Sequence, residues 1–176
     1  GLAVVLAIVK LSARDAPEAK QVTEAIAQRI QALLRAHDVS QGELDNPEVS
    51  LTDLVETSLA PYRSDALTAS VGGPDVMLQA RSITPVGLML HEMTTNAVKY
   101  GGWSQPGGTI AVDWRRERDD IVLTWRESGT EIVEMPTRQG FGSMLMTSSA
   151  RQLGGSVDRE FATGGAVITI RFPSDG

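Results

Sequence analysis

Three polar side chains on one predicted helix have the types and spacing that nucleotide chemistry requires. Glu92, Asn96 and Lys99 follow one another at intervals of four and three residues, so they share one face of a helix. They supply a carboxylate that can accept a proton, an amide oxygen that can bind Mg²⁺ and an ammonium that can bind phosphate. A core helix rarely places an acid, an amide and a base on one stripe. The sequence therefore indicates a nucleotide site along this face.

The predicted helix spans residues 82–100, with Pro85 in its first turn. Its opposite face is apolar and can be buried: Val86, Leu90, Met93 and Ala97. Each polar residue also has an ordinary structural interpretation. Asn96 could be an exposed or backbone-bonded amide, Glu92 a surface carboxylate, and Lys99 a solvated cation at the helix end. Asn96 is a poor helix former in mid-helix, which favours a functional role beside the other two.

His91 and Tyr100 flank the polar stripe, and the sequence leaves their roles open. His91 lies about 100° around the helix from Glu92, so it could assist catalysis, bond to Glu92 or pack. It is no zinc-protease histidine, because Thr95 stands where that motif needs a second one. Tyr100 could flank a nucleotide or pack.

Two later segments add to the predicted site. Residues 121–129 form an alternating strand that ends at Glu127, and residues 139–146 form a glycine-rich turn that opens an apolar helix. The backbone N–H groups around Gly140 and Gly142 could bind an anion, although a lone Gly-x-Gly is more often a tight turn. The sequence has no P-loop, so a nucleotide site must be of another kind.

Together these segments resemble the Bergerat-type ATP-binding domain shared by histidine kinases, Hsp90 and MutL. Within that group the chain is similar to the HWE histidine kinases, which are named for a His and a Trp-x-Glu; His91 and the segment Trp125-Arg126-Glu127 stand at those places. The resemblance covers nearly the whole chain. It implies that Asn96 binds the Mg²⁺ that bridges the triphosphate, that Lys99 contacts phosphate, and that Glu92 orients or deprotonates the attacking histidine.

The resemblance also implies the other site residues. Glu127 would accept a hydrogen bond from the adenine amino group, whereas its ordinary interpretation is a strand-end residue facing water. Trp125, on the same sheet face, is expected in the core. The remaining expected ATP-binding residues are Tyr100, Gly129, Gly140, Phe141, Gly142 and Ser143, with His91 as a second catalytic candidate. The family usually continues with Gly-Gly-Pro, whereas this chain has Gly129-Thr130-Glu131. Residues 132–139 would form a short ATP lid in which Arg138 could contact phosphate.

The predicted fold class is α+β with two domains. Residues 1–41 form a helical hairpin, which is half of a four-helix bundle, and residues 49–176 form a two-layer α/β sandwich of the Bergerat type. The stripe of the second hairpin helix comprises Val22, Ile26, Ile30, Leu33 and Leu34. In the sandwich we expect helices at residues 51–60, 82–100 and 143–153. We expect strands at 67–71 and 76–79 around a turn, at 109–115 and 120–127 around a four-residue turn, and at 156–161 and 166–172.

Composition narrows the partners. The net charge of −6 and pI of about 4.9 argue against nucleic acid. The absence of cysteine excludes disulfides and is compatible with the cytoplasm, where we expect the protein. The apolar run at residues 2–9 is too short to span a membrane.

The function that the resemblance implies is that of a two-component histidine kinase, which transfers the ATP γ-phosphoryl to a histidine and onward to a response regulator. Its cofactors would be ATP and Mg²⁺, and it would dimerise through the hairpin. The family's acceptor histidine precedes a segment like residues 2–5, so this chain is expected to lack it; His37, on the second helix, does not match it. The alternatives are an inactive pseudokinase or phosphotransfer scaffold, and a serine kinase of the same ATPase group.

Overall fold

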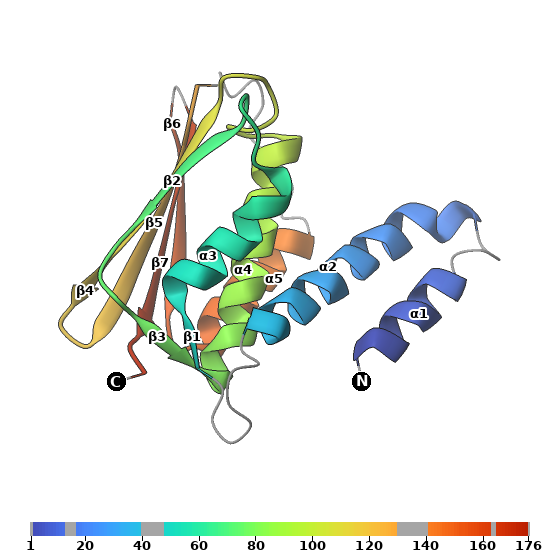
Figure 1. Cartoon of the computed structure of the whole chain (residues 1–176), viewed down its shortest axis with the longest axis horizontal. Helices are drawn as coiled ribbons and strands as arrows, with labels where there is room; N and C mark the ends of the chain where they lie inside the picture. Colours follow the sequence, from blue (N-terminus) through green and yellow to red (C-terminus); the bar gives the residue numbers. More distant parts are fainter. Residues whose placement is uncertain (1, 13–16, 40–47, 130–140, 163–164, 176) are drawn as a thin grey trace.

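The architecture is a helical hairpin packed on a sandwich of helices and sheet (Figure 1). The computed structural model describes residues 2–12, 17–39, 48–129, 141–162 and 165–175. The main sheet has five strands in the order β2-β4-β5-β7-β6. They are β2 (Thr68–Gly72), β4 (Thr109–Glu117), β5 (Asp120–Ser128), β6 (Ser156–Ala162) and β7 (Gly165–Pro173). Strand β2 runs parallel to β4 and the other neighbours are antiparallel, which confirms the predicted mixed sheet.

Three helices cover one face of this sheet, as the predicted two-layer sandwich requires (Figure 1). They are α3 (Leu51–Leu59), which is followed by the short helix η3 (Ala60–Tyr62), α4 (Ala80–Lys99) and α5 (Phe141–Gln152). The core between the layers joins apolar side chains of α3 and α4 to those of β4, β5 and β7. Ser50 caps α3 by accepting a hydrogen bond from the Asp53 backbone N–H at 3.4 Å, the usual role of a serine just before a helix.

Two short strands differ from the expected pairing. The structure has a strand at residues 68–72 and another at 77–79, but they do not pair with each other. Strand β3 (Met77–Gln79) instead pairs antiparallel with β1 (Glu48–Ser50), a strand that the sequence did not reveal. The chain between β2 and β3 passes close to Trp114, whose indole donates to the Pro74 carbonyl at 2.8 Å. A Cβ on Gly73 would lie 2.5 Å from that indole, so glycine permits this close passage.

The β4–β5 hairpin is tighter than expected. Its register continues to the pair Glu117 and Asp120, so the turn has two residues rather than four. Arg118 takes a φ of 58° there, which is the left-handed conformation that such a tight hairpin turn needs.

The N-terminal helices form the predicted hairpin. Helix α1 (Leu2–Ser12) packs on α2 (Lys20–Val39), which begins after the short helix η2 (Pro17–Ala19). Helix α2 packs in turn against α3 and α4. Its apolar stripe divides in two, because Ile30 is buried whereas Val22 and Ile26 are exposed. Exposed apolar side chains continue along α1 at Val4, Val5, Ile8 and Leu11. In the described part of the chain, no helix has both the length and the apolar character to cross a membrane.

Helix α4 begins two residues earlier than predicted, so Pro85 lies in its second turn rather than its first. The helix start is fixed by a residue from the other end of the chain. Asp175 accepts hydrogen bonds from the Gln79 backbone N–H at 3.1 Å and from Arg81 Nε at 2.7 Å. Its side chain is only 4% exposed. Burial alone would raise the pKa of Asp175, but the hydrogen bonds from Ser82, Arg81 and Gln79 outweigh burial and lower this pKa.

Replacing Asp175 with alanine should destabilise the sandwich by about 1 kcal/mol at neutral pH, the usual cost of losing a helix cap. Because the pKa of Asp175 is lowered in the fold, its contribution is complete above the unfolded value, near pH 4, and is lost as the pH falls through the folded value. Urea unfolding at several pH values tests this. The difference in unfolding free energy between the parent and D175A should become smaller in acid. The control D158A changes an exposed acid and should have little effect on the unfolding free energy at any pH. A gap that widens in acid would contradict the capping role.

Candidate functional site

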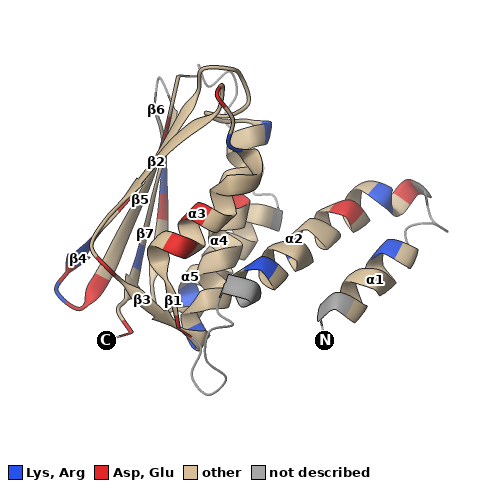
Figure 2. Ribbon diagram, viewed as in Figure 1, with Lys and Arg blue, Asp and Glu red and all other residues tan. Residues whose placement is uncertain are grey.

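The polar stripe on α4 runs from a buried to an exposed environment. Glu92 is 3% exposed, Asn96 is partly buried and Lys99 is exposed. The opposite face is buried as predicted: Val86, Leu90, Met93 and Ala97. Figure 2 shows charged residues along α2 and at the β4–β5 turn, while most of α4 carries no charge. The few charged groups on α4 therefore stand out on a helix that is otherwise uncharged.

Glu92 is not the surface carboxylate of the ordinary interpretation, because it is held by the hairpin. Arg29 of α2 donates from Nε to Oε1 at 2.7 Å and from one terminal nitrogen to Oε2 at 3.2 Å. This two-pronged geometry is the strong form of an arginine–carboxylate contact. The pairing compensates a carboxylate that has lost nearly all its water.

The first turn of α5 closes on the same carboxylate. A Cβ on Gly142 would lie 2.5 Å from Oε2 of Glu92, so a larger residue there would have to displace the carboxylate or the backbone of α5. Ser143 lies beside it, and its hydroxyl accepts a hydrogen bond from Arg159 of β6 at 2.6 Å. The structure thus brings the predicted residues Glu92, Gly142 and Ser143 to one place. Gly140, Arg138 and the lid at 132–139 lie outside the described residues, as does the side chain of Phe141.

Glu127 lies beside the C-terminal end of α4. It is 7% exposed, so it does not face water as a strand-end acid would. Its Oε1 accepts a hydrogen bond from Nε1 of Trp125 at 3.1 Å, and its Oε2 accepts one from the Gly102 backbone N–H at 3.1 Å. Burial raises the pKa of Glu127, and the hydrogen bonds from Trp125 and Gly102 oppose that rise. Trp125 is fully buried, as expected for the core.

The residues that end α4 are open to solvent. Tyr100 is 73% exposed, so packing does not account for its place. Asn96 accepts hydrogen bonds at its backbone carbonyl from the N–H groups of Tyr100 and Gly101, which close the helix. Gly129, after β5, has a φ of +89° and approaches the carbonyl of Gly107, so its place requires glycine.

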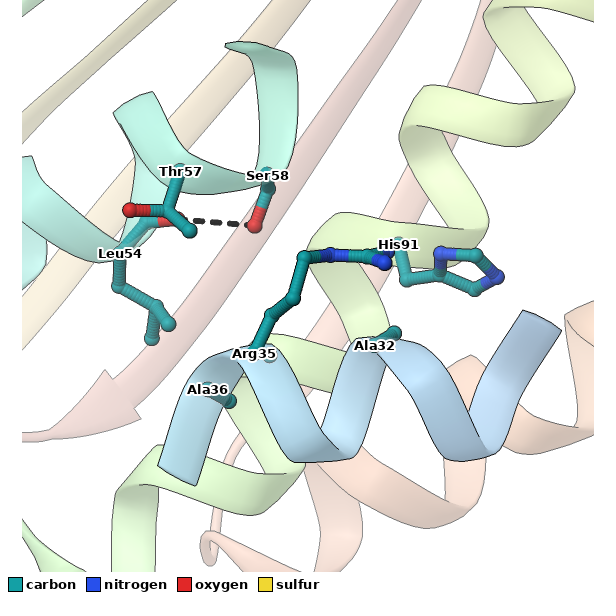
Figure 3. A pocket seen from close by; sticks show the side chains of 8 residues that line it. Ala32, Arg35, Ala36, Leu54, Thr57, Ser58 and His91 are labelled. Atoms are coloured by element: carbon teal, nitrogen blue, oxygen red, sulfur yellow. Dashed lines mark hydrogen bonds between the residues drawn. The ribbon is translucent and has the colours of Figure 1, made fainter. Parts of the chain in front are cut away.

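His91 occupies a different environment from the rest of the stripe. It is 6% exposed and lines a cavity of about 10 Å³ between α2, α3 and α4, room for one water molecule. Figure 3 shows Arg35 extending from α2 toward His91, with Leu54, Thr57 and Ser58 of α3 on the other side. Loss of hydration lowers the pKa of His91 to about 4; Glu92 opposes the shift, while Arg35, Arg29 and Lys99 add to it. The ring is therefore neutral at physiological pH, and its surroundings are those of a packed residue.

Sequence reasoning did not find Arg29 or the Gly102 backbone. Arg29 precedes Ile30 in the apolar stripe of α2, so it could be suspected as a cation at the border of a packed face. Its partner lies 63 residues away, a separation that no helical periodicity connects.

Two protein-family models match this chain. Residues 82–176 match the family model described as histidine kinase-, DNA gyrase B- and HSP90-like ATPases, which is more than half of the chain. The chain belongs to this ATPase family. Residues 1–75 match the model of the HWE histidine kinases, which confirms the resemblance seen in the sequence.

Two relatives of this ATPase-family chain are named as blue-light-activated histidine kinases. The chain is 36% identical over 176 residues to blue-light-activated histidine kinase 1 of Erythrobacter litoralis, covering 97% of this chain and 49% of the relative. It is 33% identical over 178 residues to the blue-light-activated histidine kinase of Brucella anthropi, covering 98% of this chain and 36% of the relative. The chain thus spans half or less of the length of these relatives.

Solved structures share the fold. The histidine kinase domain of a blue-light-activated histidine kinase from Erythrobacter litoralis superposes with a TM-score of 0.68 at 16% identity, covering 99% of this chain and 86% of that one. The ATP-binding domain of PrrB from Mycobacterium tuberculosis gives a TM-score of 0.58 at 22% identity, covering 76% and 100%. At these identities the likeness concerns the fold alone.

Removing Arg29 should destabilise the fold more than neutralising Glu92 does. In R29M the buried carboxylate loses its two donors, whereas in E92Q the partly exposed Arg29 can turn toward water. We expect losses of about 3 kcal/mol for R29M and about 1 kcal/mol for E92Q, measured by urea unfolding. As a control, R126M removes an exposed ion pair with Asp113 and should cost less than about 1 kcal/mol. A larger loss in E92Q than in R29M would contradict this.

Acid should destabilise this ATPase-family chain through His91. The unfolded chain binds a proton near pH 6.5 and the folded one near pH 4, so stability falls as the pH is lowered through that window. The melting temperature of the variant H91Q should change less between pH 7 and pH 4 than that of the parent. NMR titration of the ring protons gives an independent check, since an imidazole that titrates near 6.5 in the folded protein would refute the depressed pKa.

Proposed function

We propose that the chain is the dimerisation hairpin (residues 1–41) and the catalytic ATP-binding domain (residues 49–176) of a two-component histidine kinase. The observation that carries the proposal is the buried acceptor Glu127 beside the end of α4, whose face holds Glu92, Asn96 and Lys99. Family membership and the names of the relatives support it. In the intact protein, the proposed reaction transfers the γ-phosphoryl of ATP to a histidine nitrogen and then to an aspartate on a response regulator.

In this proposal the nucleotide lies between the end of α4 and the start of α5. Glu127 accepts from the adenine amino group, and Tyr100 and Gly129 flank the nucleotide. Lys99 binds phosphate at the exposed end of the stripe, where a cation loses little hydration. The first turn of α5, with Gly142 and Ser143, offers N–H groups to phosphate, and Gly140 and Phe141 complete this turn. Asn96 would hold Mg²⁺, which when bound neutralises charge on the phosphates.

Glu92 is the proposed base. As the histidine nitrogen attacks the γ-phosphorus, the bond to ADP breaks and the proton of the attacking ring passes to the carboxylate. Arg29 fixes the orientation of this carboxylate and takes one lone pair on each oxygen, and an ionised carboxylate has about four. We propose that His91, which directly precedes Glu92, helps to position Glu92. It does not act as an acid in this proposal, because its ring is neutral.

The exposed apolar side chains of the hairpin support a homodimer. Val4, Ile8 and Leu11 recur along one side of α1, and Val22 and Ile26 continue on α2. A second hairpin packed against this surface would complete a four-helix bundle. The response regulator is the other proposed protein partner, and the cytoplasm is the proposed location.

Calorimetric titration with MgATP tests the proposal directly. The parent should bind with magnesium-dependent affinity, and N96A should weaken binding at least tenfold because the metal ligand is lost. The matched control Q152A removes an exposed amide at the end of α5 and should bind like the parent. A folded parent that does not bind would leave a phosphotransfer scaffold.

The same protein can be used to test which residue type accepts the phosphoryl group. When the chain is given MgATP and a separate hairpin that bears the histidine, that hairpin should acquire an acid-labile phosphate. An acid-stable product would instead indicate a serine kinase.

A further inference from the structure

The carboxylate of Glu127 is held by two donors, one from its own strand β5 and one from the loop after α4. Trp125 lies two residues earlier on β5, so both side chains point from the same sheet face. The Trp125 indole N–H binds Oε1, and the Gly102 N–H, from the loop after α4, binds Oε2. One donor on each oxygen fixes the plane of the carboxylate and leaves about two lone pairs to accept further hydrogen bonds.

The loop after α4 is shaped around this carboxylate. A Cβ on Gly101 would overlap Oε2 of Glu127, and a Cβ on Gly102 would lie 3.0 Å from its Cβ. Gly101 does not have a positive φ, so its backbone would suit an ordinary residue. The carboxylate, together with the nearby helix backbone at Ala97, is therefore what requires glycine at this position.

The same donors favour the ionised acid. Burial raises the pKa of Glu127, and the hydrogen bonds from Trp125 and Gly102 oppose this rise. The distinction matters because an ionised carboxylate only accepts, whereas a protonated one also donates. An amino group on a purine needs an acceptor, and a 6-oxo group needs a donor.

We propose that Trp125 is a positioning residue which, with Gly101 and Gly102, orients Glu127 as a hydrogen-bond acceptor and so sets the preference for 6-amino over 6-oxo purines. This inference rests on the proposed function, in which Glu127 meets the base. It adds a role for Trp125 beyond filling the core.

The first test compares MgADP with MgIDP, its 6-oxo analogue, by calorimetry on the parent and W125F. Phenylalanine retains most of the apolar volume but lacks the indole N–H. The affinity for MgADP should fall about tenfold, and the ratio of ADP to IDP affinity should fall with it. In W125F the loss of MgADP affinity on acidification should also begin at a higher pH, because one donor to the ionised acid is gone.

The matched control is W114F, which removes another buried indole N–H, the one bonded to the Pro74 carbonyl. It should lower stability but leave both the ADP-to-IDP ratio and its pH dependence as in the parent. A purely structural role for Trp125 would make W125F behave in the same way, and that result would overturn the inference.

A second pair of variants serves if W125F does not fold. G101A places a methyl group against Oε2 and should weaken MgADP binding about tenfold. Adding E127D to G101A withdraws the carboxylate from the methyl group, so E127D should cost less in the G101A background than in the parent. Additive losses would overturn the inference. A folded parent that binds neither nucleotide would overturn the proposed function itself.

Discussion

A carboxylate removed from water must be paired, and this constraint connects the parts of the molecule. Glu92 and Glu127 are both nearly inaccessible, and each is held by a group from another element. Arg29 ties the first acid to the hairpin, and the Gly102 N–H ties the second to the end of α4. Pairing of this kind costs much desolvation and gives little net stability, so it determines where elements lie more than how firmly they hold. The hairpin lies where Glu92 can be neutralised.

Much of the fold was predictable because its signals are local. The 3.6-residue period of α4, the stripe of α2 and the alternation of β4 and β7 each identify one element from neighbouring residues. The errors in strand pairing arose where the paired segments lie far apart in the chain. Strand β1 has three residues, too few for a period, and its partner β3 lies about thirty residues further along the chain. The parallel pairing of β2 with β4 likewise leaves no mark on either segment alone.

The candidate site was predictable in residue types but not in environment. The sequence alone identifies the polar stripe of α4 and the acid at the end of β5, because a protein core rarely contains such side chains without a functional reason. The sequence could not show that Glu92 is buried, since this depends on an arginine of α2, far away in the chain. Nor could the sequence show that Trp125 donates a hydrogen bond to Glu127. Residues two apart on a strand share one face, but this does not reveal the distance between their side chains.

Both ends of α4 are fastened to the sheet. Asp175, just beyond β7, binds its first turn, and Glu127 of the neighbouring strand β5 holds the loop at its other end. A helix of twenty residues, about 30 Å long, is thus attached to the sheet at both of its ends. Sliding of this helix along its axis would have to break one of these attachments. A displacement of α2 that pulls on Glu92 through Arg29 is therefore resisted at both ends of α4.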